Sequence, residues 1–311
     1  MYCFGVDIGG TTVKLGLFTV DGEVLDKWEI PTRRENAGEN IIKDVAASVH
    51  SKCFERGIGK ADVKGIGVGV PGPITEDGTV LKCANLGWDV FNVASEVEML
   101  TGIEHVKIGN DANVAGLGEL WKGGGKGFDS IVMVTLGTGV GGGIIIDRKI
   151  VTGSKGAAGE IGHITVNYEE KDSCGCGKKG CLEQYASATG IVKEAKRLLA
   201  RESTPSKLRE LEGITAKDIF DLAKEEDGMA VELVEELGKN LGRALAHIAH
   251  VVDPEAFVIG GGVSKAGKML LDPIKKNYEE NVMFALKNRE FCLATLGNDA
   301  GIYGAAKMVL D

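Results

Sequence analysis

Residues 7–14 read Asp-Ile-Gly-Gly-Thr-Thr-Val-Lys and join two apolar segments, 3–8 and 13–20, that are expected to be strands. Glycines allow the backbone to turn tightly and to approach a ligand closely. Free N–H groups and threonine hydroxyls in such a turn can bind phosphate oxygens, and Asp7 could hold a hydrated Mg²⁺ ion. Taken alone, the stretch fits a phosphate-binding turn and a plain hairpin turn with a capping aspartate equally well.

A second turn rich in glycine and threonine, Leu-Gly-Thr-Gly-Val-Gly-Gly-Gly, occupies residues 136–143. Both turns stand in the same order of strand, turn, strand, charged turn and strand, expected at 3–30 and again at 131–152. The repetition predicts two related α/β domains with a cleft between them, in which the two turns form a phosphate clamp. The three glycines at 260–262 predict a third close approach of backbone to ligand, or a simple turn from strand to helix.

The remainder of the chain predicts alternating strands and helices, which is typical of α/β layers. Further strands are expected at 64–70, 106–108, 256–259 and 291–295, and helices at 38–56, 91–100, 112–121, 184–200, 216–224, 230–252 and 300–310. We expect a smaller N-terminal domain of residues 1–120, with a C-terminal helix at about 299–311 packing back on it. Residues 121–298 are expected to form the larger domain.

The composition is typical of a globular protein and excludes several classes. The 311 residues carry a formal net charge of −9, and 43% of them are hydrophobic. An acidic chain lacks the basic face that sequence-independent nucleic-acid binding requires. No signal peptide or membrane-spanning stretch is recognisable, so we expect a cytoplasmic location and no membrane partner.

Asn110, Asp111, Ala112 and Asn113 stand between an expected strand and an expected helix. The position of Asp111 by itself favours a role as the cap of that helix. The alternative is a base at a ligand cleft that accepts a hydroxyl proton.

Three of the seven cysteines, Cys174, Cys176 and Cys181, cluster in one short stretch. In a chain without an export signal, such a cluster indicates a metal site rather than disulfides. Together with His163 the cysteines make a set of three thiolates and one imidazole, which fits a closed, structural Zn²⁺ site. His163 is one of five histidines and the least defined of the four ligands.

Two carboxylates, Glu160 and Glu183, flank this cluster in sequence. If the metal orders the segment, the two side chains are suited to hydrogen bonding with adjacent hydroxyls of a sugar. The alternative is that both are solvated surface glutamates, which are common.

Together these motifs resemble the ROK family of bacterial sugar kinases and sugar-responsive repressors, and most of all its glucokinase branch. The resemblance rests on Asp-x-Gly-Gly-Thr near the start, Gly-Val-Pro-Gly-Pro at 69–73, Asn-Asp-Ala-Asn at 110–113, the second glycine turn, Glu-Ile-Gly-His at 160–163 and Cys-x-Cys-Gly-x-x-Gly-Cys-x-Glu at 174–183. The motifs follow the family's order over essentially the whole chain. The resemblance implies the two-domain fold of the actin-like ATPases and hexokinases, an α/β fold with a cleft between the domains.

The resemblance also implies a role for each matching residue. Asp111 would be the catalytic base that accepts the proton of a sugar's 6-hydroxyl, and His163 would both ligate zinc and touch the sugar. The sugar-binding positions would be Asn85, Asn110, Asp111, Glu160, His163 and Glu183. The positions that bind ATP with its Mg²⁺ would be Asp7, Gly10, Thr11, Thr12 and Lys14, then Gly137, Thr138 and Gly139, and near the adenosine Gly260, Gly261 and Gly262.

These roles predict ATP-dependent phosphorylation of a hexose, with D-glucose as the first choice. N-acetylmannosamine, fructose and allose are alternative substrates, and polyphosphate stays open as a donor. A sugar-sensing repressor of the family would have an added N-terminal DNA-binding domain, for which a glycine turn beginning at residue 7 leaves no room, so we expect no nucleic-acid partner. The resemblance implies a homodimer or a homotetramer.

Overall fold

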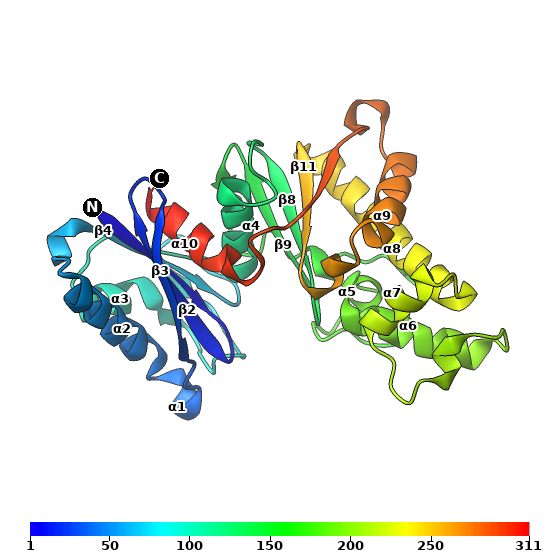
Figure 1. Ribbon diagram of the computed structural model, residues 1–311, viewed down its shortest axis with the longest axis horizontal. Coiled ribbons are helices and arrows are strands. Elements are labelled where there is room, and N and C mark those ends of the chain that lie inside the picture. The colour runs from blue at the N-terminus through cyan, green and yellow to red at the C-terminus, as the bar shows by residue number, and fades with distance from the viewer. Residues whose placement is uncertain (311) are drawn as a thin grey trace. The chain divides into compact units, whose positions relative to one another are not determined.

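The computed structural model describes residues 1–310, which form two compact α/β units (Figure 1). Unit 1 comprises Met1–Asp129, Gly143–Gly159 and the described residues from Thr295 onward, and unit 2 comprises Ser130–Gly142 and Glu160–Ala294. The division into residues 1–120 and 121–298 stays a prediction. The last residue of the segment expected to be the C-terminal helix, Asp311, lies outside the described residues.

Unit 1 is built on a five-stranded sheet with the strand order β3-β2-β1-β4-β7. β1 pairs antiparallel with β2 and parallel with β4, and β4 pairs parallel with β7. The strands are β1 (Tyr2–Ile8), β2 (Thr12–Thr19), β3 (Val24–Pro31), β4 (Val63–Val70) and β7 (Val106–Asn110), and a small second sheet consists of β5 (Thr79–Val80) and β6 (Phe91–Asn92). The helices are α1 (Glu35–Gly38), α2 (Ile41–Arg56), α3 (Val93–Thr101), α4 (Asp111–Lys122) and α10 (Ala300–Leu310).

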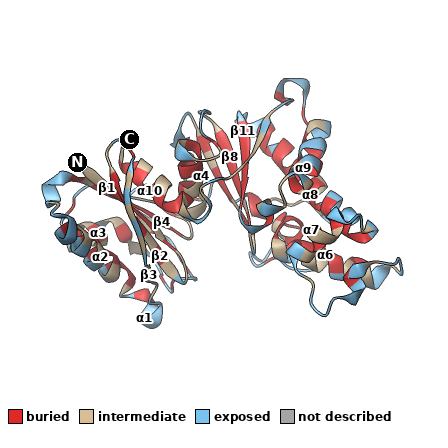
Figure 2. Cartoon of the chain, viewed as in Figure 1, coloured by how far each residue is buried: buried red, intermediate tan, exposed pale blue. Residues whose placement is uncertain are grey.

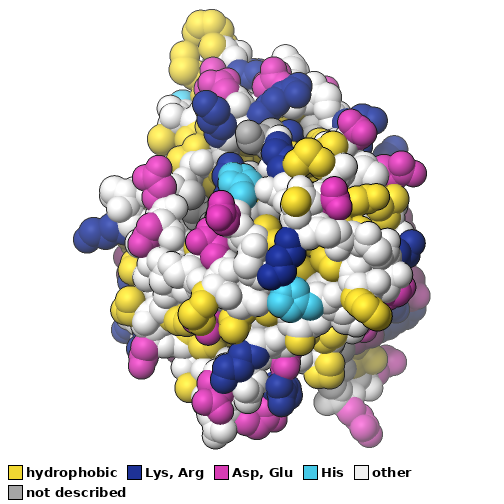
Figure 3. Space-filling model, turned by 90° about the vertical axis from the view of Figure 1, so that its left-hand side faces the viewer, with side chains coloured by type: hydrophobic (Ala, Val, Ile, Leu, Met, Phe, Trp, Pro, Cys, Tyr) yellow, Lys and Arg dark blue, Asp and Glu magenta, His cyan; other side chains and the backbone are white. Residues whose placement is uncertain are grey.

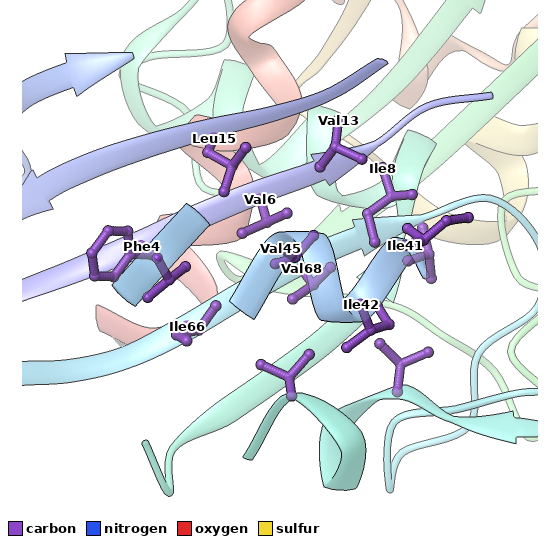
Figure 4. Close-up of a cluster of buried hydrophobic side chains, with 14 of the residues drawn as sticks. Phe4, Val6, Ile8, Val13, Leu15, Ile41, Ile42, Val45, Ile66 and Val68 are labelled. Atoms are coloured by element: carbon purple, nitrogen blue, oxygen red, sulfur yellow. The ribbon is translucent and has the colours of Figure 1, made fainter. Parts of the chain in front are cut away.

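Helices cover both faces of this sheet. Alternate residues of each strand point to opposite faces, and in β1 the residues on both faces are apolar. From β1, Phe4, Val6 and Ile8 pack into one apolar cluster with side chains of α2 and α3, part of which is drawn in Figure 4. Cys3 belongs to a separate cluster, with Ile302 and other residues of α10. The sheet therefore lies between α2 and α3 on one side and α10 on the other.

Helix α10 approaches both the sheet and α4 too closely for ordinary side chains at the points of contact. A Cβ atom on Gly67 of β4 would overlap the carbonyl oxygen of Ala305 in α10. Likewise, a Cβ on Gly304 of α10 would overlap the carbonyl oxygen of Val114 in α4. Glycine is required at these positions because the backbones themselves are in contact.

The second sheet has the order β10-β9-β8-β11-β12, and β11 pairs parallel with both β8 and β12. Its strands are β8 (Ile131–Leu136), β9 (Val140–Ile146), β10 (Lys149–Ile150), β11 (Ala256–Gly260) and β12 (Glu290–Leu293). The longer helices of unit 2 are α6 (Ala188–Arg201), α7 (Ala216–Lys224), α8 (Gly228–Val252) and α9 (Lys268–Asn281), and α5 (Glu183–Ala186) is a single turn. Figure 2 shows that the central strands of both sheets are largely buried.

The expected α/β fold and the repeated order of strands are confirmed. In each sheet three consecutive strands, β1-β2-β3 or β8-β9-β10, form an antiparallel arrangement. Two further strands, β4 and β7 or β11 and β12, then add in parallel beside the first strand of that arrangement. No helix of residues 1–310 is long and apolar enough to cross a membrane. On the face of the molecule drawn in Figure 3, basic and acidic side chains are interspersed.

Several expected boundaries differ from the structure by a few residues, and two differ more. The second glycine turn is only residues 137–139 and not 136–143, because β8 ends at Leu136 and β9 already begins at Val140. The helix expected at 184–200 is interrupted at Ser187, which has an extended backbone and caps α6 by accepting the N–H of Gly190. Glycines within a strand and a serine within a helical pattern concealed both boundaries.

We expect the substitution Gly304→Ala to lower the free energy of unfolding by about 3 kcal/mol, because the new methyl group would overlap the backbone of α4. Urea denaturation measures the effect. Gly228→Ala, at the first residue of α8, is the matched control, since its Cβ would meet no atom within 4 Å. Equal stability of the two variants would contradict the proposed backbone contact.

Candidate active site and metal centre

In unit 1, the carboxyl ends of the parallel strands β1, β4 and β7 lie at one level of the sheet. Asp7 of β1 is in register with Gly69 of β4, and Gly69 with Gly109 of β7. Asp111 follows β7 directly as the first residue of α4. Ligands of open α/β sheets bind at this edge, so its side chains are candidates for binding and chemistry.

Asp7 and Asp111 act on each other at this edge. Burial and, to a lesser extent, the negative charge of Asp111 raise the pKa of Asp7 to about 6. Lys14, opposite Asp7 in β2, acts in the other direction. The two carboxylates suit a cation such as Mg²⁺, and the ammonium group suits the phosphate that accompanies it.

The cap of α4 is Asn110 and not Asp111. The Asn110 side chain accepts the N–H groups of Ala112 at 3.1 Å and Asn113 at 3.2 Å, and its Nδ2 donates to the carbonyl of Gly72. The helix therefore does not need Asp111 as its cap, and the capping role that its position favoured is wrong. Asp111 is oriented instead by the Ala112 N–H, which donates to its Oδ1 at 2.8 Å.

The first glycine turn is held at its base and open at its tip. The Gly9 N–H donates to the Thr12 carbonyl at 3.0 Å, and the hydroxyl of Thr32, just after β3, donates to the Gly9 carbonyl at 2.7 Å. A Cβ on Gly10 would meet no atom within 4 Å, and Thr11 is exposed. The Nζ of Lys14 donates to the carbonyl of Asn298 at 3.0 Å, which ties β2 to the segment before α10.

Asn85 is exposed on a turn that begins at Cys83 and is closed by the Leu86 N–H donating to the Cys83 carbonyl. Burial raises the pKa of the Cys83 thiol, and the charge of Asp111 adds to this effect. The turn that carries Asn85 is therefore within reach of the charge of Asp111, and the role of Asn85 in sugar binding stays a prediction.

In unit 2, the second glycine turn is supported from the start of α6. The Ala188 N–H donates to the Gly137 carbonyl at 2.8 Å, and the Thr189 hydroxyl donates to the Thr138 carbonyl at 2.6 Å. Sequence reasoning missed these two supports. The two hydroxyl residues in Ser-Ala-Thr-Gly at 187–190 are typical of a helix N-terminus. They are the signal that could have indicated these two hydrogen bonds.

Of the glycines at 260–262, Gly261 lies against the end of the strand that leads into this turn. Gly261 has φ = +84°, and a Cβ there would overlap the backbone of Leu136, the last residue of β8. Because β8 and β11 are parallel and in register, their carboxyl ends meet, and both glycine segments lie at the same edge of the second sheet.

His163, Cys174, Cys176 and Cys181 are brought together, with one ligand atom of each lying within 4.8 Å of all the others. The Sγ atoms of Cys176 and Cys181 are 3.6 Å apart, and Cys174 Sγ is 3.8 Å from His163 Nδ1. For tetrahedral Zn²⁺ with Zn–S distances of about 2.3 Å, the edge between two sulfurs is roughly 3.8 Å. The four side chains therefore fit a metal of this size and geometry.

Glu183 connects the metal cluster to the second glycine turn. Its Oε2 accepts the Val140 N–H at 3.1 Å, and a Cβ on Gly139 would overlap the same oxygen. Its Oε1 is 3.8 Å from Cys174 Sγ. Glu160 lies on the other side of the cluster, with its Oε2 3.9 Å from Nε2 of His163, the ring nitrogen that is not turned toward the cysteines.

The structure thus forms two groups of the predicted residues. Unit 1 brings together Asp7, Lys14, Asp111 and the turns at 9–12 and 83–87. Unit 2 brings together the turn at 137–139, the glycines at 260–262, the metal cluster and its two glutamates. The individual roles in sugar and ATP binding stay predictions.

The chain is similar to known proteins over its whole length. The model of the ROK family matches residues 3–311. A glucokinase of Halalkalibacterium halodurans is 44% identical over 98% of this chain and 94% of its own length. A crystal structure of a ROK family glucokinase from Streptomyces griseus, in complex with glucose and AMPPNP, covers 99% of both chains with 35% identity and a TM-score of 0.74. A xylose repressor of Caldicellulosiruptor bescii is 29% identical over 99% of this chain and 77% of its own length.

We expect Asp7→Asn to be more stable than the unchanged protein at pH 8 and equally stable at pH 4. Folding raises the pKa of Asp7 from 3.8 to about 6, so the folded state binds a proton more tightly than the unfolded chain. Stability therefore falls as the pH rises through this interval, by about 3 kcal/mol, and the amide removes this loss. Thermal unfolding without ligands at both pH values measures the difference.

Asp26→Asn provides a control of opposite sign. Hydrogen bonds from Lys52 and Arg56 lower the pKa of Asp26, so its replacement should destabilise the protein at pH 8. If Asp7→Asn also destabilised the protein at pH 8, the ionised form of Asp7 would be favoured by folding and the argument would be wrong.

Proposed function

The chain belongs to the ROK family, and we propose that it is a glucokinase, which transfers the γ-phosphoryl group of ATP to the 6-hydroxyl of D-glucose. The observation that carries the proposal is the match, over 99% of both chains, to a glucokinase that binds glucose and an ATP analogue. The edge of the unit 1 sheet, with its paired carboxylates, supports the same reaction.

Asp111 is the general base in this proposal. Its carboxylate stands at the first residue of α4, held by the Ala112 N–H, at the sheet edge where ligands of α/β folds bind. The transferred phosphoryl group passes through a loose transition state, so the proton of the hydroxyl can leave late and a carboxylate is a sufficient base. Most of the rate then comes from positioning and from charge stabilisation.

Sugar recognition is assigned to polar side chains of both units. From unit 1 these are Asn85 and Asn110 together with Asp111, and from unit 2 they are Glu160, His163 and Glu183. Carboxylates and amides can each hold two adjacent hydroxyls, which suits a pyranose. A sugar that lacks one matched hydroxyl would leave a buried partner unsatisfied, at a cost of roughly 1–3 kcal/mol.

The phosphates of ATP are assigned to the two glycine turns. Gly10, Thr11, Thr12 and Lys14 contribute from unit 1, with Asp7 holding Mg²⁺. Gly137, Thr138 and Gly139 contribute from unit 2, and Gly260, Gly261 and Gly262 lie next to the adenosine. The open tip of the first turn and the close approach of Gly261 to Leu136, the residue before the second turn, support these assignments.

Zn²⁺ is assigned a structural role. His163, through Nδ1, and the thiolates of Cys174, Cys176 and Cys181 would hold it, so that no ligand position remains for substrate. The segment that it orders carries Glu160 and Glu183, and His163 Nε2 is left to donate to or accept from a sugar hydroxyl.

We expect one Zn²⁺ per chain, and Cys176→Ala should lose it together with thermal stability and sugar affinity. Cys176 is the exposed one of the three cysteines, so its replacement by alanine leaves no cavity in the core. The loss of stability in this variant therefore reflects the loss of the metal. A chelator should lower the melting temperature of the unchanged protein and leave that of Cys176→Ala as it is.

The control for this experiment is Cys292→Ala in β12, which should keep its zinc and its response to the chelator. Freshly purified, reduced protein without zinc would contradict the metal assignment. Full zinc occupancy in a His163→Ala variant would show that the fourth ligand is a different residue.

Measuring ADP release over a panel of hexoses tests the function. We expect D-glucose to be phosphorylated at O6 with ATP and Mg²⁺, and mannose and 2-deoxyglucose to react more weakly. Asp111→Asn should lower kcat by about 10²- to 10⁴-fold with little change in glucose affinity, because the base is lost while its shape is kept. Asp21→Asn, an exposed carboxylate in the β2–β3 turn, is the matched control and should be fully active.

Other outcomes of the panel point to other functions. A tenfold preference for N-acetylmannosamine or fructose would change the substrate but keep the kinase, and turnover with polyphosphate would change the donor. Sugar binding without transfer from any donor would favour a sugar-responsive regulator, the alternative to which the similarity with a xylose repressor points.

A further inference from the structure

Glu119 on α4 is fully buried, yet no arginine or lysine is paired with it among the ion pairs of the described residues. Its carboxylate is held by backbone N–H groups instead. Oε2 accepts the N–H of Gly124 at 2.8 Å and of Thr295 at 2.9 Å, and Oε1 accepts the N–H of Leu296 at 2.9 Å. One side chain thus fixes two chain segments that are far apart in sequence.

The loop after α4 is folded around this residue. The carbonyl of Glu119 accepts the N–H groups of Gly123 and Gly125, both at 3.0 Å, so three successive glycine N–H groups point at one glutamate. A Cβ on Gly123 would overlap Oε2 of Glu119. Glycine at position 123 is therefore required by the buried carboxylate, and the loop is fixed by hydrogen bonds to Glu119.

The two segments held by Glu119 are links between the units. The chain passes from one unit to the other at four places, after Asp129, Gly142, Gly159 and Ala294. Glu119 binds residues just before the first of these passages and just after the last. The second crossing between the units, at Gly142 and Gly143, also contacts α4. A Cβ on Gly143 would lie 2.8 Å from the carbonyl oxygen of Ala112.

We propose that Glu119 is a positioning residue, which fixes the first and last links to α4 and thereby sets where that helix presents Asp111. Asp111 is the first residue of α4, and Glu119 lies about two turns further along. The middle of α4 is held by its close packing against α10, and the attachments to the links fix its two ends. This inference rests on the proposed role of Asp111 as the base.

Glu119→Gln tests the proposal with the least change in shape. An amide offers one acceptor oxygen and sets an NH₂ group against an N–H donor, so at least one of the three bonds is lost. Hydrogen exchange should become faster at the amides of Gly124, Thr295 and Leu296, by about tenfold or more. With glucose and ATP, kcat should fall by about tenfold while the dissociation constant for glucose changes less than about threefold.

Gly123→Ala is the second variant, because its methyl group displaces the carboxylate without removing it, and it should reproduce both effects. Val49→Ala is the control for simple loss of stability, since Val49 is buried on α2, away from α4 and the links. The variants are compared at equal distance below their melting temperatures, and Val49→Ala should then retain the exchange rates at the links and the kcat of the unchanged protein.

Unchanged exchange at the three amides in Glu119→Gln would overturn the inference, as would faster exchange with an unaltered kcat. An equal loss of kcat in Val49→Ala would reduce the role of Glu119 to general stability. The activity of the unchanged protein separates a failure of this inference from a failure of the proposed function. If the unchanged protein phosphorylates no hexose, the kinase assignment fails, whatever the variants do.

Discussion

The parallel register of β1, β4 and β7 is the constraint on which unit 1 depends. It aligns Asp7, Gly69 and Gly109 across three strands, and the chain leaves this edge directly into α4. Two acidic side chains from distant parts of the sequence, Asp7 and Asp111, are therefore placed at the same edge. Burial of Asp7 and, to a lesser extent, the negative charge of Asp111 make ionisation of Asp7 unfavourable, and its pKa is raised to about 6. A cation bound beside Asp7 would favour the ionised carboxylate.

Much of this arrangement could be predicted from the sequence, because the signals were local. The glycine turn at 9–12, the alternation of apolar residues in β1 and the helix at Ala300–Leu310 follow from the chain itself, and the repeat of strands predicted a second unit of similar design. The capping of α4 was misjudged, since Asn110 and Asp111 are both good caps and only the backbone decides between them. The burial of Glu119 could not be predicted, because its partners at 295–296 come from a segment more than half the chain away.

In unit 2, the positions of the cysteines predicted a metal cluster, but not what the cluster is attached to. Glu183 follows the last cysteine by two residues and binds the backbone at Val140, so a metal ion in the cluster and a ligand at the second glycine turn would act on the same short segment. Thr189 and Ala188 reinforce this attachment from α6. The serine that interrupts the expected long helix is the reason such an attachment is possible: without the break at Ser187, the start of α6 would not turn toward residues 137–139.

The packing of α10 has a consequence for the order in which the protein can fold during its synthesis. The face of the unit 1 sheet that bears Cys3 and Phe18 is covered by Ile302, Ala306 and Val309, which the ribosome adds after every residue of unit 2. Unit 2 can therefore become complete while one apolar face of the first-made strands is still exposed. The N-terminal strands are the earliest part of the chain to emerge and among the last to be covered, so the nascent chain is most prone to aggregation, and most in need of a chaperone, in its first-made part.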